Sequence, residues 1–324
     1  MKRNITLDYT KLFLSLLVIA IHNPIIRDFR FLSNLIVNGL ARIAVPCFFV
    51  INGLYLSKVL NNNLSFKKYI KKLLTFYLVW MLIYSPYYLF DFMDNMTISI
   101  LLNATNILFG FWHLWYIIAL IGGVFCLYYL VKKKYSNNKI LLLAFILFMI
   151  GWVIQKVELF YPSVEGLIGS IIRSSFPSRN FLFMGFPFIA IGYLISKNDF
   201  INQVKKHFSN IYILLLFFLL LFAETILHYY MIGRRGFDFY FALILVCPAL
   251  ILYIQKKSKV VQVEDDFISK LSAAIYFIHP LILYFVRNTF PDFESTRRYV
   301  LIVFFSVLFG SALIYANKKL KIFF

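Results

Sequence analysis

Two side chains able to do chemistry interrupt the first apolar segment of the chain, KLFLSLLVIAIHN (11–23). Lys11 and His22 are eleven residues apart, a spacing that returns to the same helical face within about 20°, at ~16 Å along the axis. We therefore expect both side chains on one face of a helix over roughly 7–26. Ionisable groups inside a membrane are costly and so are candidates for function. The alternative is that each side chain reaches the nearer headgroup layer.

Two later apolar segments also begin with polar groups. Arg42 opens RIAVPCFFVINGLYL, 42–56, where an arginine needs a counter-charge or a hydrated cavity. His113 lies between two tryptophans in FWHLWYIIAL, 111–120. Indole rings often mark a membrane boundary, but a histidine between them is less usual. Arg42 and His113 are therefore candidate site residues.

A histidine followed by proline occurs within the apolar segment SAAIYFIHPLILYF, 272–285. Tyr276 and His279 are three residues apart, and Pro280 leaves one helix carbonyl without its amide donor and favours a kink. Such features are tolerated where helices line a cavity. Tyr276 and His279 join the candidates for a site within the membrane.

Other kinds of site are not indicated. The histidines are single and separated, no HExxH or CxxC spacing occurs, and Cys47, Cys126 and Cys247 lie in apolar runs, so we predict no metal site and no disulfide framework. Phosphate-binding glycine loops and a GxSxG elbow are absent from the sequence.

The composition indicates an integral membrane protein. The 324 residues are 61% hydrophobic and only 15% charged, with a mean hydropathy of +0.79. Apolar runs of about 18 residues recur along the chain, the length that crosses ~30 Å of hydrocarbon. The net charge of +19 could suggest nucleic acid, but the basic residues punctuate apolar spans and form no single patch. We predict no nucleic-acid partner.

We predict an all-α polytopic fold with about ten transmembrane helices. The expected spans are roughly 7–26, 35–57, 69–90, 112–131, 139–156, 180–196, 210–229, 237–254, 269–288 and 298–317. Segment 97–111 is apolar but short and is expected to be an interfacial or re-entrant helix. With the N-terminus inside, cytoplasmic segments carry 21 Lys and Arg against 10 in the outer loops, which places both termini in the cytoplasm.

The two kinds of basic residue divide between the predicted sides. Cytoplasmic cations are nearly all lysine, and the outer loops use Arg27, Arg30, Arg173, Arg179, Arg234, Arg235, Arg287, Arg297 and Arg298. The planar arginine fork binds carboxylate or phosphate at two points. These arginines either line an outer cavity that holds an anionic or hydroxyl-rich acceptor or pair with acids of the same loops. Those acids are Asp28, Glu158, Glu165, Asp238, Asp292 and Glu294.

In order and spacing, four motifs resemble membrane-bound acyltransferase family 3, the bacterial O-acyltransferases that modify surface polysaccharides. They are the Lys11-to-His22 spacing, RIAVPCFFVINGLYL, HLWYIIAL and IYFIHPL. Two departures are visible. The second motif usually ends in Ser-Gly and here reads Asn52-Gly53, and KKYIKK (67–72) replaces a common Arg-x-x-Arg.

The resemblance implies a single transmembrane acyltransferase domain over 1–324, in the bacterial cytoplasmic membrane. The implied reaction moves an acetyl or other acyl group from cytoplasmic acetyl-CoA to a hydroxyl of a cell-surface or lipid-linked glycan, without a metal. The family pattern marks His22 as catalytic, with Lys11 on the same stripe. A neutral imidazole can take the proton of the attacking hydroxyl.

Further roles follow from the same resemblance. Arg42, His113 and Tyr276 are candidate donors to the oxyanion. His279 and Arg179 are expected to bind substrate. The phosphates of CoA, which is strongly anionic, would meet the cytoplasmic lysines Lys67, Lys68, Lys71 and Lys72.

Two other functions stay open. A transporter or flippase for a lipid-linked sugar or small metabolite would usually show repeated halves, which we do not find in the sequence. An amino-acid-binding or signalling module on the same membrane fold is the other, because similar membrane domains are fused to racemase domains in some resistance proteins. We expect no such soluble domain within 1–324.

Overall fold

The computed structural model describes residues 2–88, 96–160, 177–197, 208–232, 237–258, 260–262 and 266–320. These residues are almost entirely helical, and the chain divides into two compact units. The first unit combines Met1–Ile51 with Asn198–Ile322, and the second is Asn52–Lys197. The all-helical prediction is confirmed, apart from one short two-stranded ribbon.

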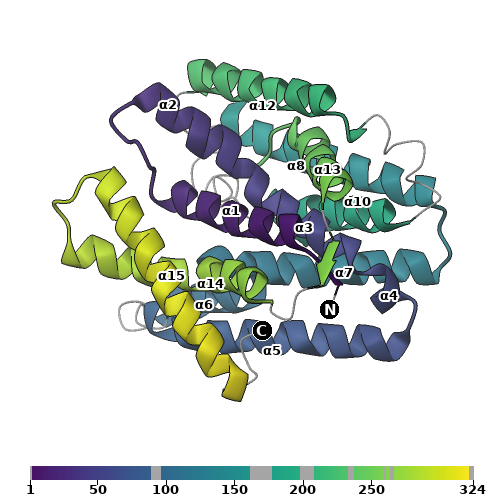
Figure 1. The fold of residues 1–324 in the computed structure, drawn as a ribbon, viewed down its shortest axis with the longest axis horizontal. Helices are drawn as coiled ribbons and strands as arrows, with labels where there is room; N and C mark the ends of the chain where they lie inside the picture. Colours follow the sequence, from purple (N-terminus) through teal and green to yellow (C-terminus); the bar gives the residue numbers. More distant parts are fainter. Residues whose placement is uncertain are drawn as a thin grey trace. The chain divides into compact units, whose positions relative to one another are not determined.

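The first unit is built from both ends of the chain (Figure 1). Its elements are β1 (Lys2–Asn4), α1 (Ile5–His22), α2 (Arg30–Asn34), the π-helical turn η1 (Leu35–Gly39), the 3₁₀ turn η2 (Leu40–Ile43), most of α3 (Ala44–Leu54), α12 (Ile211–Ile232), α13 (Leu243–Lys257), β2 (Val260–Gln262), α14 (Phe267–Thr289) and α15 (Ser295–Leu320).

Helices α1 and α14 run in the same direction. Antiparallel pairing of β1 with β2 holds together the segments just before the two helices. Near one end Lys11 Nζ donates to Ser269 Oγ at 3.1 Å, and at the far end of α1 the rings of His22 and His279 are 5.5 Å apart. The two helices therefore pair in register along most of α1.

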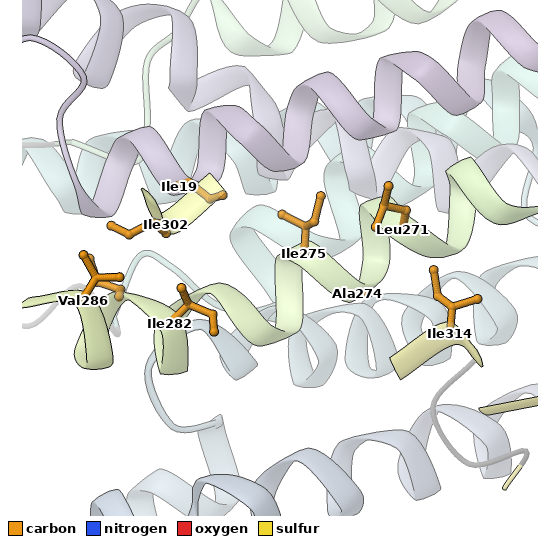
Figure 2. Packing of buried hydrophobic residues seen from close by; sticks show 9 residues of the cluster. Ile19, Leu271, Ala274, Ile275, Ile282, Val286, Ile302 and Ile314 are labelled. Atoms are coloured by element: carbon orange, nitrogen blue, oxygen red, sulfur yellow. The ribbon is translucent and has the colours of Figure 1, made fainter. Parts of the chain in front are cut away.

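Helix α15 returns antiparallel to both. Tyr299 donates to the Leu16 carbonyl at 3.2 Å, and Asn23 Nδ2 donates to the Ser295 carbonyl at 2.9 Å. Apolar residues on one face of α14 make the core between α1, α14 and α15 (Figure 2), namely Leu271, Ala274, Ile275, Ile282, Leu283 and Val286, with Ile19, Ile302 and Ile314 from its neighbours. Much of the remaining α15 surface is apolar and exposed, as expected of a helix that faces lipid.

Residues 30–54 form one helical segment that changes pitch in its middle. The π turn η1 is followed by the 3₁₀ turn η2 before regular helix resumes in α3. Gly39 lies at this change and packs closely on α12, since a Cβ there would lie 3.2 Å from Thr225 Oγ1. Such irregular turns often occur at functional sites.

The second unit holds the middle of the chain. Its elements are α4 (Ser57–Leu60), α5 (Asn63–Tyr88), α6 (Met96–Phe109), the 3₁₀ turn η4 (Trp112–Leu114), α7 (Trp115–Lys132), α8 (Asn137–Phe160), the π turn η5 (Phe181–Gly185) and α10 (Phe186–Ser196). Helices α5 and α7 run antiparallel, since Tyr128 donates to Asn63 at one end and Tyr84 lies against His113 at the other.

Seven helices within the described residues are long and apolar enough to cross a membrane. They are Ile5–His22, Arg30–Leu54, Asn103–Lys132, Asn137–Lys156, Ile211–Met231, Phe267–Thr289 and Ser295–Leu320. Phe181–Ser196 is apolar but shorter. A polytopic membrane protein is therefore confirmed in coarse form. The expected spans 69–90 and 237–254 fall on α5 and α13, which are not among the seven.

Two further predictions concern segment 97–111 and the charged residues of the outer loops. Segment 97–111 is helical up to Phe109, and its second half belongs to the same apolar stretch as α7. Among the outer charged residues, Glu165, Arg173, Arg234 and Arg235 lie outside the described residues.

Candidate functional site

Lys11 and His22 of α1 both face α14, as their eleven-residue spacing predicts. Lys11 Nζ donates to Ser269 Oγ and to Asp8 Oδ1, at 3.1 and 3.0 Å, and this ion pair is mostly buried. His22, at the last position of α1, is half-buried beside His279. The ammonium is thus held near the start of α1, ~16 Å from the imidazole by helical rise. Asp8, the partner of Lys11, was not among the predicted site residues.

His279 is fully buried, and its backbone surroundings determine its tautomer. Nδ1 lies 2.8 Å from the Tyr276 carbonyl and 3.1 Å from the Ile275 carbonyl. Carbonyl oxygens can only accept hydrogen bonds, so Nδ1 carries the proton and Nε2 of the neutral ring carries the lone pair.

Pro280 explains why a carbonyl is available to His279. In a regular helix the Tyr276 carbonyl would accept from the amide of residue 280, but proline has no N–H. The His279 imidazole supplies the missing donor. The expected freed carbonyl is present, and the histidine beside the proline uses it.

The Tyr276 ring extends this group towards α3. The ring is 4% exposed and lies edge-on to Phe48, with centroids 5.9 Å apart. The His279 ring centroid is 6.2 Å away. His22, Tyr276 and His279 are thus gathered at the contact between α1, α14 and α3 within the first unit.

Arg42 has the counter-charge that its position requires. Nη1 donates to Asp238 Oδ1 at 2.7 Å, and Nη2 donates to Asn38 Oδ1 at 3.0 Å. Asn38 in turn donates to Asn34 at 2.7 Å, so three residues at intervals of four form a polar ladder along the irregular helix 30–54. Arg42 Nε is buried and has no hydrogen bond among the described residues.

The surroundings of Asp238 are also polar. Glu224 accepts from the Phe241 and Ala242 amides at 2.9 and 3.1 Å, which caps the approach to α13. The Tyr240 ring lies 5.1 Å from that of His228.

A second aromatic and cationic group lies in the second unit. His113 is 3% exposed, with its ring 5.0 Å from that of Tyr84. The Arg179 guanidinium lies 5.0 Å from the centre of the Trp115 ring, a cation–π distance. Within this unit, His113 and Arg179 flank the start of α7.

A strained turn holds this part of α7 in place. Gly110 has φ of +89° and Trp112 has φ of +47°, a rare value for an aromatic residue. One turn further along α7, Tyr116 accepts a hydrogen bond from Asn52 Nδ2 at 2.8 Å. The asparagine that replaces the family's usual serine therefore makes a direct contact with the HLWYIIAL motif.

The four predicted donor-binding lysines share the exposed face of α5. Lys67, Lys68, Lys71 and Lys72 are all exposed. The opposite face carries Phe66, whose ring stacks on Tyr128 at 3.8 Å. The lysines make no ion pair with another described residue. They form a solvent-facing basic stripe, which we call the α5 lysine stripe.

No group of metal-ligating side chains occurs within the described ranges. Cys47 and Cys247 are buried free thiols, and Cys126 is partly buried.

The family assignment comes from comparison with known proteins. A family model described as an acyltransferase domain matches residues 4–316. The chain belongs to acyltransferase family 3. The match includes every candidate residue from Lys11 to His279, so both groups described above belong to the matched region.

Two curated relatives of this family-3 chain are named amino-acid racemase, both from Enterococcus faecalis. One is 28% identical over 344 residues, which cover 98% of this chain and 47% of the relative. The other is 32% identical over 238 residues, or 68% of this chain and 31% of the relative. The chain therefore spans less than half the length of the relatives it matches. No solved structure matches it.

Several contacts of this family-3 chain could have been found from sequence and others not. The i, i+3 spacing of Asp8 and Lys11 and the i, i+4 spacing of Asn38 and Arg42 were visible signals. Arg287 donates to the His22 carbonyl at 2.7 Å, across 265 residues of sequence. No local pattern reveals that contact.

Proposed function

We propose that this protein is a membrane O-acyltransferase that moves an acyl group, acetyl in the simplest case, from cytoplasmic acyl-CoA to a hydroxyl of a cell-surface or lipid-linked glycan. Family membership supports acyl transfer. The donor, the acceptor and the roles of individual residues are part of the proposal.

The observation that carries the proposal is the pair of histidines. His22 is half-buried at the end of α1, where a substrate from that side can reach it, and His279 stands behind it with a tautomer held by backbone carbonyls. General-base catalysis needs a group whose ordinary pKa is close to neutral pH, as that of an imidazole is, with a neighbour that keeps it in position.

In the proposed reaction, His22 takes the proton of the acceptor hydroxyl as its oxygen attacks the thioester carbonyl. The C–O bond forms, the tetrahedral oxyanion collapses, and the C–S bond breaks. CoA leaves as a thiolate that takes up the proton. The Tyr276 hydroxyl and Arg42 Nε, both of the first unit, are the proposed donors to the oxyanion.

The donor is proposed to bind through its phosphates. The α5 lysine stripe offers four ammonium groups with no acid partner among the described residues. Lysine meets phosphate as a mobile point charge and lacks the two-point fork of arginine. The Lys11–Asp8 ion pair lies at the start of α1, which is also predicted to be on the cytoplasmic side.

We further propose ten spans with both termini in the cytoplasm. If only the seven long apolar helices crossed, α14 would be the sixth span and would oppose α1. Helices α1 and α14 run parallel, however, so both must cross the membrane in the same direction. This requires an odd number of spans before α14 in addition to the five already counted. Helix α5, residues 181–196 and α13 supply three. Since α15 opposes α1, its end and the start of α1 share one side, and the positive-inside rule assigns that side to the cytoplasm.

The experiment compares surface glycans from cells with and without the gene, by proton NMR of their O-acyl groups. Glycans from cells with the wild-type protein should show an O-acyl signal that is missing from glycans of cells with the His22→Gln variant. His228→Gln is the matched control, because His228 is another buried histidine of the first unit that packs on Phe237 and Tyr240. Equal O-acylation by wild type and His22→Gln would remove His22 from the reaction.

A second candidate function comes from the relatives. The alignment of 98% of this chain to a protein named amino-acid racemase favours a membrane unit that binds an amino acid. Thermal shift separates the candidates: acetyl-CoA should raise the Tm of an acyltransferase, whereas free amino acids should raise that of an amino-acid-binding unit. A flippase would respond to neither.

A further inference from the structure

The loop that follows His22 is tied to the first turn of α15. Asn23 Nδ2 donates to the Ser295 carbonyl at 2.9 Å, and Ser295 Oγ donates to the Pro24 carbonyl. Thr296 Oγ1 donates to the Ile25 carbonyl at 2.6 Å. These three bonds fix residues 23–25 against residues 295–296.

This clamp brings three arginines together. Arg27 lies two residues beyond Ile25, and Arg298 lies two residues beyond Thr296. Arg287, near the end of α14, donates to the His22 carbonyl at 2.7 Å, and the charges of Arg27 and Arg298 both act on it. We call Arg27, Arg287 and Arg298 the arginine cluster.

The cluster has no counter-charge among the described residues. None of its three members forms an ion pair there, although Asp28, Asp292 and Glu294 are close to them in sequence. Arg298 Nε is buried and has no hydrogen-bond partner in the described part of the chain. Arg42, in contrast, forms an ion pair with Asp238.

Like charges close together repel one another, and a bound anion relieves that repulsion. Arg27 and Arg287 are exposed, so an anion can reach them from solvent. Arginine is suited to that anion, because its fork binds phosphate or carboxylate through two parallel hydrogen bonds. The first turn of α15 adds a weaker attraction of the same sign.

We propose that the arginine cluster binds an anionic group of the acyl acceptor, a phosphate or carboxylate, and so holds the acceptor beside His22. The inference rests on the proposed function and narrows its acceptor to an anionic glycan, such as one carried on a lipid diphosphate. Because Arg287 donates to the backbone carbonyl of His22, an anion on the cluster would lie near the residue that would activate the hydroxyl.

The test measures binding in nanodiscs of neutral phosphatidylcholine, with farnesyl diphosphate and inorganic pyrophosphate as probes. We expect saturable binding that weakens with salt and whose Kd rises about tenfold in Arg27→Gln/Arg298→Gln. Arg297→Gln is the matched control, one residue from Arg298 on α15 and exposed, and should change Kd less than about twofold. Arg298→Lys, which keeps the charge, should still weaken binding because the fork is lost.

Three results overturn the proposal. The first is equal Kd for the wild type and the double variant. The second is equal weakening by Arg297→Gln. The third is retention of anionic phospholipid with no binding of either diphosphate, which would assign the cluster to lipid headgroups alone. Melting temperatures verify folding, and Arg298→Lys serves if the double variant does not fold.

Failure of the proposed function would look different. Cluster-dependent diphosphate binding by a protein that transfers no acyl group would sink the acyltransferase proposal and leave the anion site standing. Acyl transfer that depends on His22 but not on the arginine cluster would leave the acyltransferase proposal standing and overturn the anion site.

Discussion

The rings of His22 and His279 lie side by side, with centroids 5.5 Å apart and planes inclined by 32°. One is half-buried at the end of α1, and the other is fully buried in α14. Backbone carbonyls of α14 hold Nδ1 of His279, at 2.8 and 3.1 Å. The pair therefore combines an imidazole at the end of α1 with a second one whose orientation is fixed.

Variants of the two histidines should differ in severity. His22→Gln removes the proposed base, and we expect acyl transfer to fall by about 10²–10⁴. His279→Gln removes only the neighbour and its carbonyl bonds, so a loss of roughly tenfold is expected. Steady-state transfer with purified protein measures both. A larger loss in His279→Gln than in His22→Gln would reverse the assigned roles.

Pro280 should act through His279. Pro280→Ala restores an amide that can donate to the Tyr276 carbonyl and compete with His279 Nδ1. We expect a kcat about tenfold lower, a changed pH–rate profile and little change in the KM for acyl-CoA. Pro248→Ala, in the middle of α13, is the matched control and should leave the pH profile unchanged. An unaltered profile in Pro280→Ala would show that the proline has no part in setting the tautomer.

The ladder that ends in Arg42 should contribute stability. Asp238→Asn leaves the arginine charge without its acid and should cost about 1–3 kcal/mol, because a charge-assisted hydrogen bond is lost. Arg42→Gln/Asp238→Asn should recover part of that loss, since no unpaired charge remains. Thermal unfolding in detergent measures this, with the exposed Asp28→Asn as control. A double variant less stable than Asp238→Asn would contradict the pairing argument.

The α5 lysine stripe should govern donor affinity. Replacing all four lysines by glutamine should raise the KM for acetyl-CoA roughly tenfold at low salt and much less at high salt, because the contacts are electrostatic. Lys318→Gln/Lys319→Gln, at the end of α15, changes charge on the same predicted side and should have little effect. If both sets raised KM equally, the effect would be one of general surface charge.

The sequence predicted the face of α1 but not the residues that meet it. An eleven-residue spacing fixes two side chains on one helix, whereas Ser269 and His279 lie more than 250 residues away. The need of Arg42 for an acid was predictable, and Asp238 was one of several acids available. The choice among them depends on long-range packing, which no local pattern encodes.

Hydropathy alone does not decide the number of spans, for a related reason. Helix α5 begins with four lysines and polar residues, which lower its hydropathy, yet it lies along α7 from Asn63 to Tyr84. The pitch changes at Gly39 and before Phe186 also have no simple sequence signal, because close helix packing produces them.

The central claim is that His22 receives the acceptor proton in an acyl transfer across the membrane. The most direct measurement uses proteoliposomes of fixed orientation, with labelled acetyl-CoA supplied on the side of the α5 lysine stripe and glycan acceptor on the other. The account predicts labelled glycan from wild type and from His228→Gln, and none above background from His22→Gln. Labelled glycan formed at the wild-type rate by His22→Gln would contradict it.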